Sequence, residues 1–81
     1  MSMIVHVRLF ATLRRHYPHL EIGESMAVEL TDGATIGQLI EHLHLPSAEI
    51  KIVFANSITH KWEHTLDDGD QVGIFPPVGG G

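Results

Sequence analysis

Hydrophobic and polar residues alternate in three stretches of the chain, and each stretch predicts a β-strand. In Met3 to Leu9, Glu24 to Leu30 and Gln71 to Phe75, every second side chain can enter a core while its neighbours face outward. A fourth stretch, Ile50 to Ala55, is rich in β-branched residues and is followed by Asn56-Ser57, which is typical of an interior strand and its turn. We expect these strands to share one sheet.

Two other stretches have the spacing of helices. Thr35 and Gln38 fit a capping box, which predicts that a helix begins there, and Pro46 closes the segment. The apolar positions of this helix follow at helical spacing and are Ile36, Leu39, Ile40 and Leu43. Phe10 to Tyr17 predicts a second, short helix that ends at Pro18.

The order of these elements predicts the fold class. A crossover from Ile58 to Leu66 with a short strand of its own, and a turn from Asp67 to Asp70, precede the last strand. One long helix can cover one face of a mixed five-stranded sheet, which leaves the other face partly in water. We therefore expect an α+β roll of the β-grasp, ubiquitin-like type over residues 1–75, followed by an extended tail over residues 76–81.

Length and composition limit the chemistry that the chain can perform. Its 81 residues make one domain with a modest core, and without cysteine it has no thiol nucleophile. We therefore expect no enzyme activity from the chain alone. The net charge of −5 and the single Arg14-Arg15 pair argue against a nucleic-acid partner. No apolar run approaches a length of about 18 residues and no signal-peptide pattern is present, which predicts a cytoplasmic protein without a membrane partner.

Seven histidines raise the question of a metal site. His42 and His44 lie two residues apart on the predicted helix and diverge, and His60 and His64 share a face only if the crossover is helical. We expect no metal site.

The end of the sequence, "FPPVGGG", carries the candidate chemistry. Pro76 and Pro77 lack the N–H that a sheet ladder needs, so the chain should leave the sheet in an extended form. Glycine without a Cβ can pass a narrow opening in another protein. The reactive group at the tip is the carboxylate of Gly81, which becomes an acyl donor when it is joined to AMP. The competing interpretation is an inert, disordered end.

Two segments resemble a known family. "LDDGDQVGIFPPVGGG", Leu66 to Gly81, is similar to the closing signature of the ubiquitin-like sulfur carriers: an Asp-Gly-Asp turn, a strand, Pro-Pro-Val, one variable residue and Gly-Gly. In this register Gly79 is the variable residue and Gly80-Gly81 is the functional pair. "RLFATLRR", Arg8 to Arg15, is similar to the opening strand and helix of the branch typified by the small subunit of molybdopterin synthase.

The resemblance implies a cycle that partner proteins drive. An E1-like adenylyltransferase would use ATP to adenylate Gly81, and a sulfur donor enzyme would convert it to a thiocarboxylate. The large subunit of molybdopterin synthase would receive the sulfur, in a heterotetramer because molybdopterin needs two sulfur atoms, and the chain itself would bind no cofactor. The implied partner-binding residues are Phe75, Pro76, Pro77, Val78 and Gly79.

Phe75 should project from the sheet face away from the helix, with Ile4 among its neighbours.

Three alternatives stay open: a carrier for thiazole or cysteine synthesis, a ubiquitin-like modifier of lysines, and a binding module with an inert tail.

Overall fold

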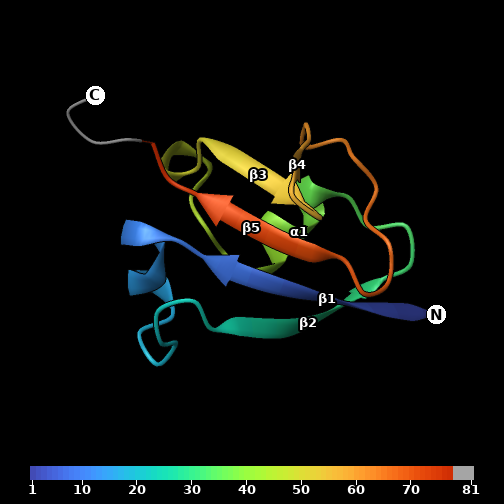
Figure 1. Ribbon diagram of the computed structural model, residues 1–81. Coiled ribbons are helices and arrows are strands. Elements are labelled where there is room, and N and C mark those ends of the chain that lie inside the picture. Colours follow the sequence, from blue (N-terminus) through green and yellow to red (C-terminus); the bar gives the residue numbers. More distant parts are fainter. Residues whose placement is uncertain (78–81) are drawn as a thin grey trace.

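The computed structural model describes residues 1–77, and its five strands form one mixed sheet (Figure 1). The strands are β1 (Ser2–Leu9), β2 (Ser25–Thr31), β3 (Ile52–Ala55), β4 (Ile58–Thr59) and β5 (Gln71–Phe75). Their order across the sheet is β2-β1-β5-β3-β4. Because β5 runs parallel to β1 and antiparallel to β3, the last strand of the chain lies in the middle of the sheet.

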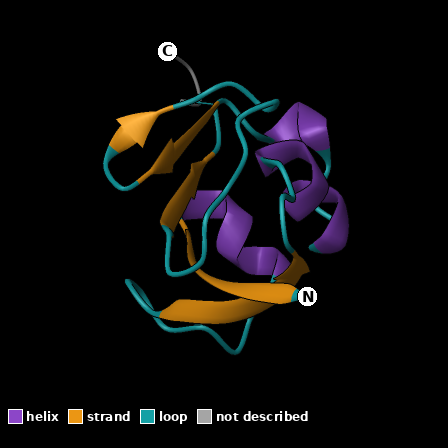
Figure 2. Cartoon of the chain, turned by 90° about the vertical axis from the view of Figure 1, so that its right-hand side faces the viewer, coloured by secondary structure: helices purple, strands orange, loops and turns teal. Residues whose placement is uncertain are grey.

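Helix α1 (Ile36–His42) lies against one face of the sheet, behind it in Figure 1, and Figure 2 shows the helices gathered on that side. The predicted capping box is confirmed: Thr35 Oγ1 accepts a hydrogen bond from the Gln38 N–H at 3.2 Å, and Gln38 Oε1 accepts one from the Thr35 N–H at 2.8 Å. These bonds satisfy amides that have no partner within the helix, which fixes where the helix begins.

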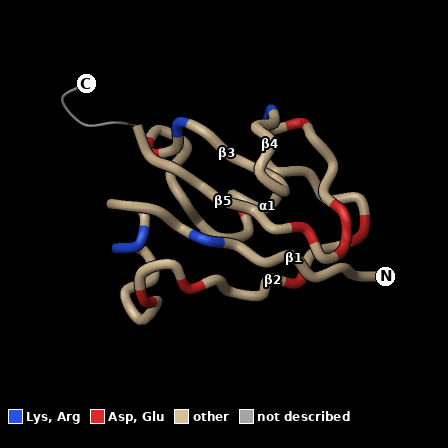
Figure 3. Tube along the Cα trace, viewed as in Figure 1, with Lys and Arg blue, Asp and Glu red and all other residues tan. Residues whose placement is uncertain are grey.

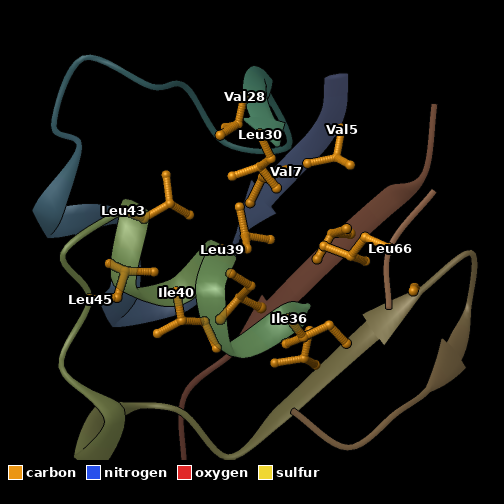
Figure 4. Close-up of a cluster of buried hydrophobic side chains, with 14 of the residues drawn as sticks. Val5, Val7, Val28, Leu30, Ile36, Leu39, Ile40, Leu43, Leu45 and Leu66 are labelled. Carbon is orange, nitrogen blue, oxygen red and sulfur yellow. The ribbon is translucent and has the colours of Figure 1, made fainter. Parts of the chain in front are cut away.

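The core fills the space between α1 and the sheet (Figure 4). Val5 and Val7 of β1 and Ile74 of β5 are fully buried, and they meet Ile36 and Leu39 of α1, which are also fully buried. Each such side chain contributes roughly 1.5–3 kcal/mol relative to an exposed position. The strand alternation predicted from the sequence is thus confirmed, and the buried positions leave the other face of the sheet open.

The short helix predicted after β1 is present, but it is a 3₁₀-helix and it begins after Phe10. A 3₁₀-helix, η1, spans Ala11–His16, and Phe10 precedes it with the extended backbone of β1 (φ −111°, ψ 149°). Ala11 then takes a positive φ of 52°, which turns the chain sharply into η1. Phe10 therefore continues the alternation of the strand by one residue. A second short 3₁₀-helix, η2 (Ser47–Glu49), was not predicted.

Two turns position the end of the chain. Asn56 and Ser57 both have positive φ, 53° and 71°, which is the geometry of a two-residue hairpin turn between β3 and β4. The buried carboxylate of Asp70 accepts hydrogen bonds from Asn56 Nδ2 and from the N–H of Asp67, each at 2.8 Å. This carboxylate ties the hairpin to the turn that leads into β5.

The fold class predicted from the sequence is confirmed: one main helix on one face of a mixed five-stranded sheet is a β-grasp roll. Strand β5 ends at Phe75, and Pro76 and Pro77 belong to no helix or strand. Within residues 1–77, no helix combines the length and the apolar character that crossing a membrane requires. The division into a domain over residues 1–75 and a tail over residues 76–81 stays a prediction.

Candidate functional site

Phe75 of β5 points to the open face, which we define as the sheet face that α1 does not cover. Alternation sends Ile74 into the core and Phe75 to the opposite side. The N–H of Lys51 donates to the carbonyl oxygen of Phe75 at 2.8 Å and pairs the end of β5 with the neighbouring segment. Pro76 and Pro77 follow directly, so the chain leaves the sheet at this point. The structure places Phe75 where the sequence predicted it, and its partner-binding role stays a prediction.

Three phenylalanine rings gather on the open face and form an aromatic patch of Phe10, Phe54 and Phe75. The Phe10 and Phe75 rings are stacked, with centroids 4.1 Å apart and planes 5° apart. Phe54 meets Phe75 edge to face, at 5.2 Å and 76°. Aromatic pairs at such distances contribute about 0.5–1.5 kcal/mol each beyond the area they bury. The three rings therefore hold one another in place before any partner arrives.

The aromatic patch borders a hollow of about 300 Å³ on the open face. Its floor includes Gly73, which lies opposite Phe54 in the register of β5 and β3. A Cβ at Gly73 would stand 3.2 Å from Cε2 of Phe10, so glycine keeps the space open. Arg8 also lines the hollow, and its Nε donates to the carbonyl oxygen of Gly23 at 3.0 Å. The hollow can accept one apolar side chain of a partner.

Charged side chains secure the two 3₁₀-helices beside the site. Arg15 Nη2 lies 2.8 Å from Glu49 Oε1, and His16 Nε2 lies 3.0 Å from the same oxygen. The hydrogen bond with His16 lowers the pKa of the Glu49 carboxyl, and the positive charge of Arg15 lowers it further against the opposing effect of desolvation. These contacts join η1 to η2 close to the start of β3.

The end of the sheet where β5 finishes carries both basic and acidic positions, whereas the turn before β5 is acidic (Figure 3). Four of the five basic residues belong to the segments at this end: Arg8, Arg14, Arg15 and Lys51. Glu21, Glu24 and Glu49 belong to segments at the same end, so this margin of the sheet carries both signs of charge.

The remaining predicted site residues fall into two groups. Val78, Gly79, Gly80 and Gly81 lie outside the described residues. Ile4 lies on the open face and is 45% exposed, but the expectation that it neighbours Phe75 was wrong. Its carbonyl oxygen accepts from the N–H of Gly69, six residues before Phe75, which is roughly 20 Å along β5. The parallel pairing of β1 and β5 separates the two side chains.

Two histidines meet although the sequence did not predict it. The crossover that holds them is not helical, yet the His60 and His64 rings are stacked, with centroids 3.6 Å apart. Parallel rings direct their nitrogen lone pairs side by side, so one metal ion cannot lie in both ring planes without moving a ring. Among residues 1–77, no three His, Cys, Asp or Glu side chains come together as metal ligands.

Sequence reasoning missed two members of the aromatic patch. Phe10 was assigned to the helical stripe, but extending the alternation of β1 by one residue would have placed it on the open face. Phe54 lies in an apolar run without clear alternation, and only its pairing with Gly73 across the sheet shows which way it points. The position of Phe10 could have been predicted from the sequence, whereas that of Phe54 depends on the register of β3 with β5.

The fold defines a ubiquitin-like class of protein, and comparison with known proteins agrees. The model of the ThiS family matches residues 7–81, which is nearly the whole chain. The chain therefore belongs to the ThiS family, whose members are ubiquitin-like sulfur carriers. No curated protein matches the chain closely enough to count as a relative.

Solved structures agree with this assignment. The Haloferax volcanii HVO 2177 protein is 30% identical with a TM-score of 0.79, covering 99% of this chain and 88% of its own. A putative molybdopterin converting factor subunit 1 from Pyrococcus furiosus is 27% identical with a TM-score of 0.74, covering 94% and 99%. The small archaeal modifier protein 1 of Haloferax volcanii shares the fold at 21% identity and a TM-score of 0.75, covering 94% and 99%.

Proposed function

We propose that this protein is the small, sulfur-donating subunit of molybdopterin synthase. Membership of the ThiS family supports the role of sulfur carrier. The likeness to a putative molybdopterin converting factor subunit, at 27% identity over almost the full length of both chains, favours the molybdenum cofactor pathway over thiazole or cysteine synthesis. The chain acts as a carrier and is not an enzyme on its own.

The observation that carries the proposal is the position of the aromatic patch. Phe75 is both the last residue of β5 and the centre of the patch, and Pro76 follows directly. A partner that binds the aromatic patch therefore lies directly beside Pro76, where the tail begins. Clustered aromatic residues beside a hollow are typical of the few residues that dominate binding energy at an interface. The E1-like adenylyltransferase and the large subunit would bind this surface in turn.

The chemistry takes place at the carboxylate of Gly81. Its oxygen attacks the α-phosphorus of ATP on the adenylyltransferase, which gives an acyl adenylate and releases pyrophosphate. A persulfide of the sulfur donor then attacks the carbonyl carbon, and AMP leaves. A second thiol, also from a partner, attacks the sulfur atom of the acyl disulfide that belongs to the donor protein. The two partner sulfurs form a disulfide, and the thiocarboxylate of Gly81 is released. The chain has no cysteine, so both thiols must come from partners.

The large subunit would then use the thiocarboxylate to bring sulfur into the cyclic pyranopterin precursor. Two loaded carriers are consumed for each dithiolene, because each carries one sulfur atom, and this supports a heterotetramer. Glycines, which have no side chains, suit passage of the tail into that active site.

A second candidate function is protein modification. The same acyl adenylate can react with a lysine amine and form an isopeptide bond. The shared fold with the small archaeal modifier protein 1 favours this alternative, although at 21% identity the likeness concerns the fold alone.

A reconstitution separates these functions. The protein is incubated with ATP, an E1-like enzyme from the same organism and a sulfur donor, and its intact mass is measured. Replacement of one oxygen by sulfur supports the carrier, and conjugates of higher mass support the modifier. The loaded protein is then given to the large subunit of molybdopterin synthase with the pyranopterin precursor, and in parallel to a thiazole synthase. Product from the thiazole synthase alone would overturn the assignment to molybdopterin.

Deletion of both Gly80 and Gly81 tests the site, because deletion of Gly81 alone would leave a Gly79-Gly80 end. We expect the variant to lose adenylation and to keep the melting temperature of the intact protein, because both glycines follow the last strand in the sequence. An added residue after Gly81 that is not removed by processing should have the same effect, and deletion of Met1 is the control. Full activity of the extended variant would disprove the role of the terminal carboxylate.

A further inference from the structure

The two outer strands of the sheet present very different free edges. β4 has two residues, whereas β2 on the opposite side has seven. Within residues 1–77 no strand pairs with the outer side of β2. Proteins usually shorten, cover or charge such an edge, because its unpaired backbone groups are a template for another strand. In this protein β4 is shortened and β2 is not.

The hydrogen bonds of β1 and β2 show which residues of β2 point outward. The N–H of Asp32 donates to the carbonyl oxygen of Met1 at 3.1 Å, which continues the antiparallel ladder beyond the strand. On β1, the N–H of His6 turns the other way and donates to the carbonyl oxygen of Asp70 at 2.9 Å. Since bonding directions alternate along a strand, residues 26, 28 and 30 bond to β1.

The remaining residues of β2 turn their backbone groups to the free edge. They are Ser25, Ala27, Glu29 and Thr31. The carbonyl oxygen of Thr31 accepts from the N–H of Ala34 at 3.0 Å and is thereby occupied. The N–H and C=O groups of Ala27 and Glu29 remain at the centre of the edge, spaced for an added strand.

A groove runs along this edge between β2 and α1. One hollow of about 390 Å³ has apolar walls that include Tyr17, Val28 and Leu43. A second hollow of about 340 Å³ continues past Leu30 and Ala34. Glu29 and His42 line both hollows, so the two meet. An added strand would direct alternate side chains into this groove, because successive side chains of a strand point to opposite faces.

The charge along the free edge of β2 indicates which kind of strand can bind there. Glu29 and Asp32 line the groove, and no lysine or arginine lines either hollow. Glu21 and Glu24 precede β2, and Figure 3 shows acidic positions along this strand. A second copy of the chain would bring its own Glu29 against this edge, and like charges across paired strands are destabilising. A cationic strand from a different protein meets no such repulsion.

We propose that the free edge of β2 binds an extended, lysine- or arginine-bearing segment of another protein by strand addition. The backbone of the segment pairs with Ala27 and Glu29, its apolar side chains enter the groove, and its cationic groups approach Glu29 and Asp32. This surface does not include the aromatic patch or the tail. It would let the protein hold a second partner while the patch is occupied, and it does not depend on the sulfur-carrier proposal.

The experiment uses the full chain labelled with ¹⁵N and an octapeptide in which valine alternates with lysine. We expect saturable shifts of the amide signals of Ala27, Glu29 and Thr31, which are among the residues whose N–H points outward. A matched peptide with glutamate in place of lysine should bind at least about tenfold more weakly, because it repels Glu29 and Asp32.

Two variants test the geometry. Ala27→Pro removes an outward N–H and leaves the bonds of residues 26 and 28 to β1 intact, and proline is tolerated at such edge positions. We expect about a tenfold loss of affinity, whereas Ala27→Thr, which keeps the N–H, should bind like the original chain. Glu29→Lys should reverse the preference between the two peptides, and it provides the test if the proline variant does not fold.

Four results would overturn the proposal. Three of them are shifts that gather on the aromatic patch, equal affinity of Ala27→Pro and Ala27→Thr, and self-association through β2 in the absence of peptide. The fourth is the absence of binding at millimolar peptide.

Discussion

The two faces of one sheet are built from the same strands and use different side chains. Toward α1, β1 and β5 present aliphatic residues such as Val7 and Ile74, which are fully buried. Toward the open face, β3 and β5 present Phe54 and Phe75, which are only partly buried. Alternation along each strand allows neighbouring residues to serve two purposes. The core face stabilises the domain, and the aromatic patch is available to a partner.

This difference predicts that stability and binding can be changed separately. A buried aliphatic side chain contributes through area removed from water and close packing, and both are lost when it is truncated. A partly exposed ring contributes less to folding and keeps area that a partner can bury. A substitution on the core face of β5 should therefore reduce mainly stability, whereas a substitution at the neighbouring position on the open face should reduce mainly partner binding.

The largest effect on stability is expected for Ile74→Ala. Truncation of this fully buried side chain leaves a cavity between β5 and α1, and we expect a loss of roughly 2–5 kcal/mol in the free energy of unfolding. Chemical denaturation measures it. Below its lowered melting temperature, the variant should still accept sulfur at the original rate. A loss of sulfur loading in the folded variant would show that the two faces are not independent.

Phe75→Ala is the matched change on the open face. It removes the stacked contact with Phe10 and the edge contact with Phe54, so we expect roughly 1–2 kcal/mol of lost stability. Binding to the E1-like enzyme or to the large subunit should weaken by at least about 30-fold. Calorimetry with each partner measures this effect, and Phe75→Leu should recover part of it. Unchanged affinity for both partners would exclude the aromatic patch as the docking surface.

The sequence predicted most of the fold because its signals were local. The alternation of β1, β2 and β5 and the Thr35-Gln38 capping box each depend on a few adjacent residues, and the structure has all of them. The short helix predicted after β1 is present, but it is a 3₁₀-helix that begins at Ala11 and not at Phe10. Periodicity alone does not distinguish a 3₁₀-helix from one turn of α-helix.

The candidate site was predictable only in part, because it depends on register. The sequence placed Phe75 on the open face, but it could not bring Phe54 beside it, since that contact follows from the pairing of β3 with β5. The stacked rings of His60 and His64 likewise depend on an irregular path that no period describes. Contacts between distant segments are fixed by the packing of the whole sheet.

Gly73→Ala should affect binding more than stability. Alanine is about 0.5–1 kcal/mol better than glycine in a strand, and this gain is offset because the new Cβ lies 3.2 Å from Phe10 and 3.5 Å from Phe75. We expect a net change in stability below about 1 kcal/mol and roughly tenfold weaker partner binding, since the methyl group fills the floor of the hollow. Gly37→Ala, in α1 on the other face of the sheet, is the control for glycine substitution, because Gly37 has no positive φ and its new Cβ would come no closer than 3.5 Å to the surrounding atoms. A stabilised variant with full affinity would mean that no partner side chain enters the hollow.

The smallest effect is expected at Glu49, which belongs to neither face. The contacts with His16 and Arg15 lower the pKa of the Glu49 carboxyl in the folded protein. They therefore stabilise the fold at pH values above the carboxyl pKa of the unfolded chain, and this stabilisation is lost as the pH falls through the lower pKa of the folded protein. Glu49→Gln should therefore melt slightly below the original chain at about pH 7, and the two curves should converge by about pH 3. Partner affinity should not change. A difference in melting temperature that persists at the lower pH would show that Glu49 acts through packing and not through its charge, and that the contacts between η1 and η2 belong with the core face.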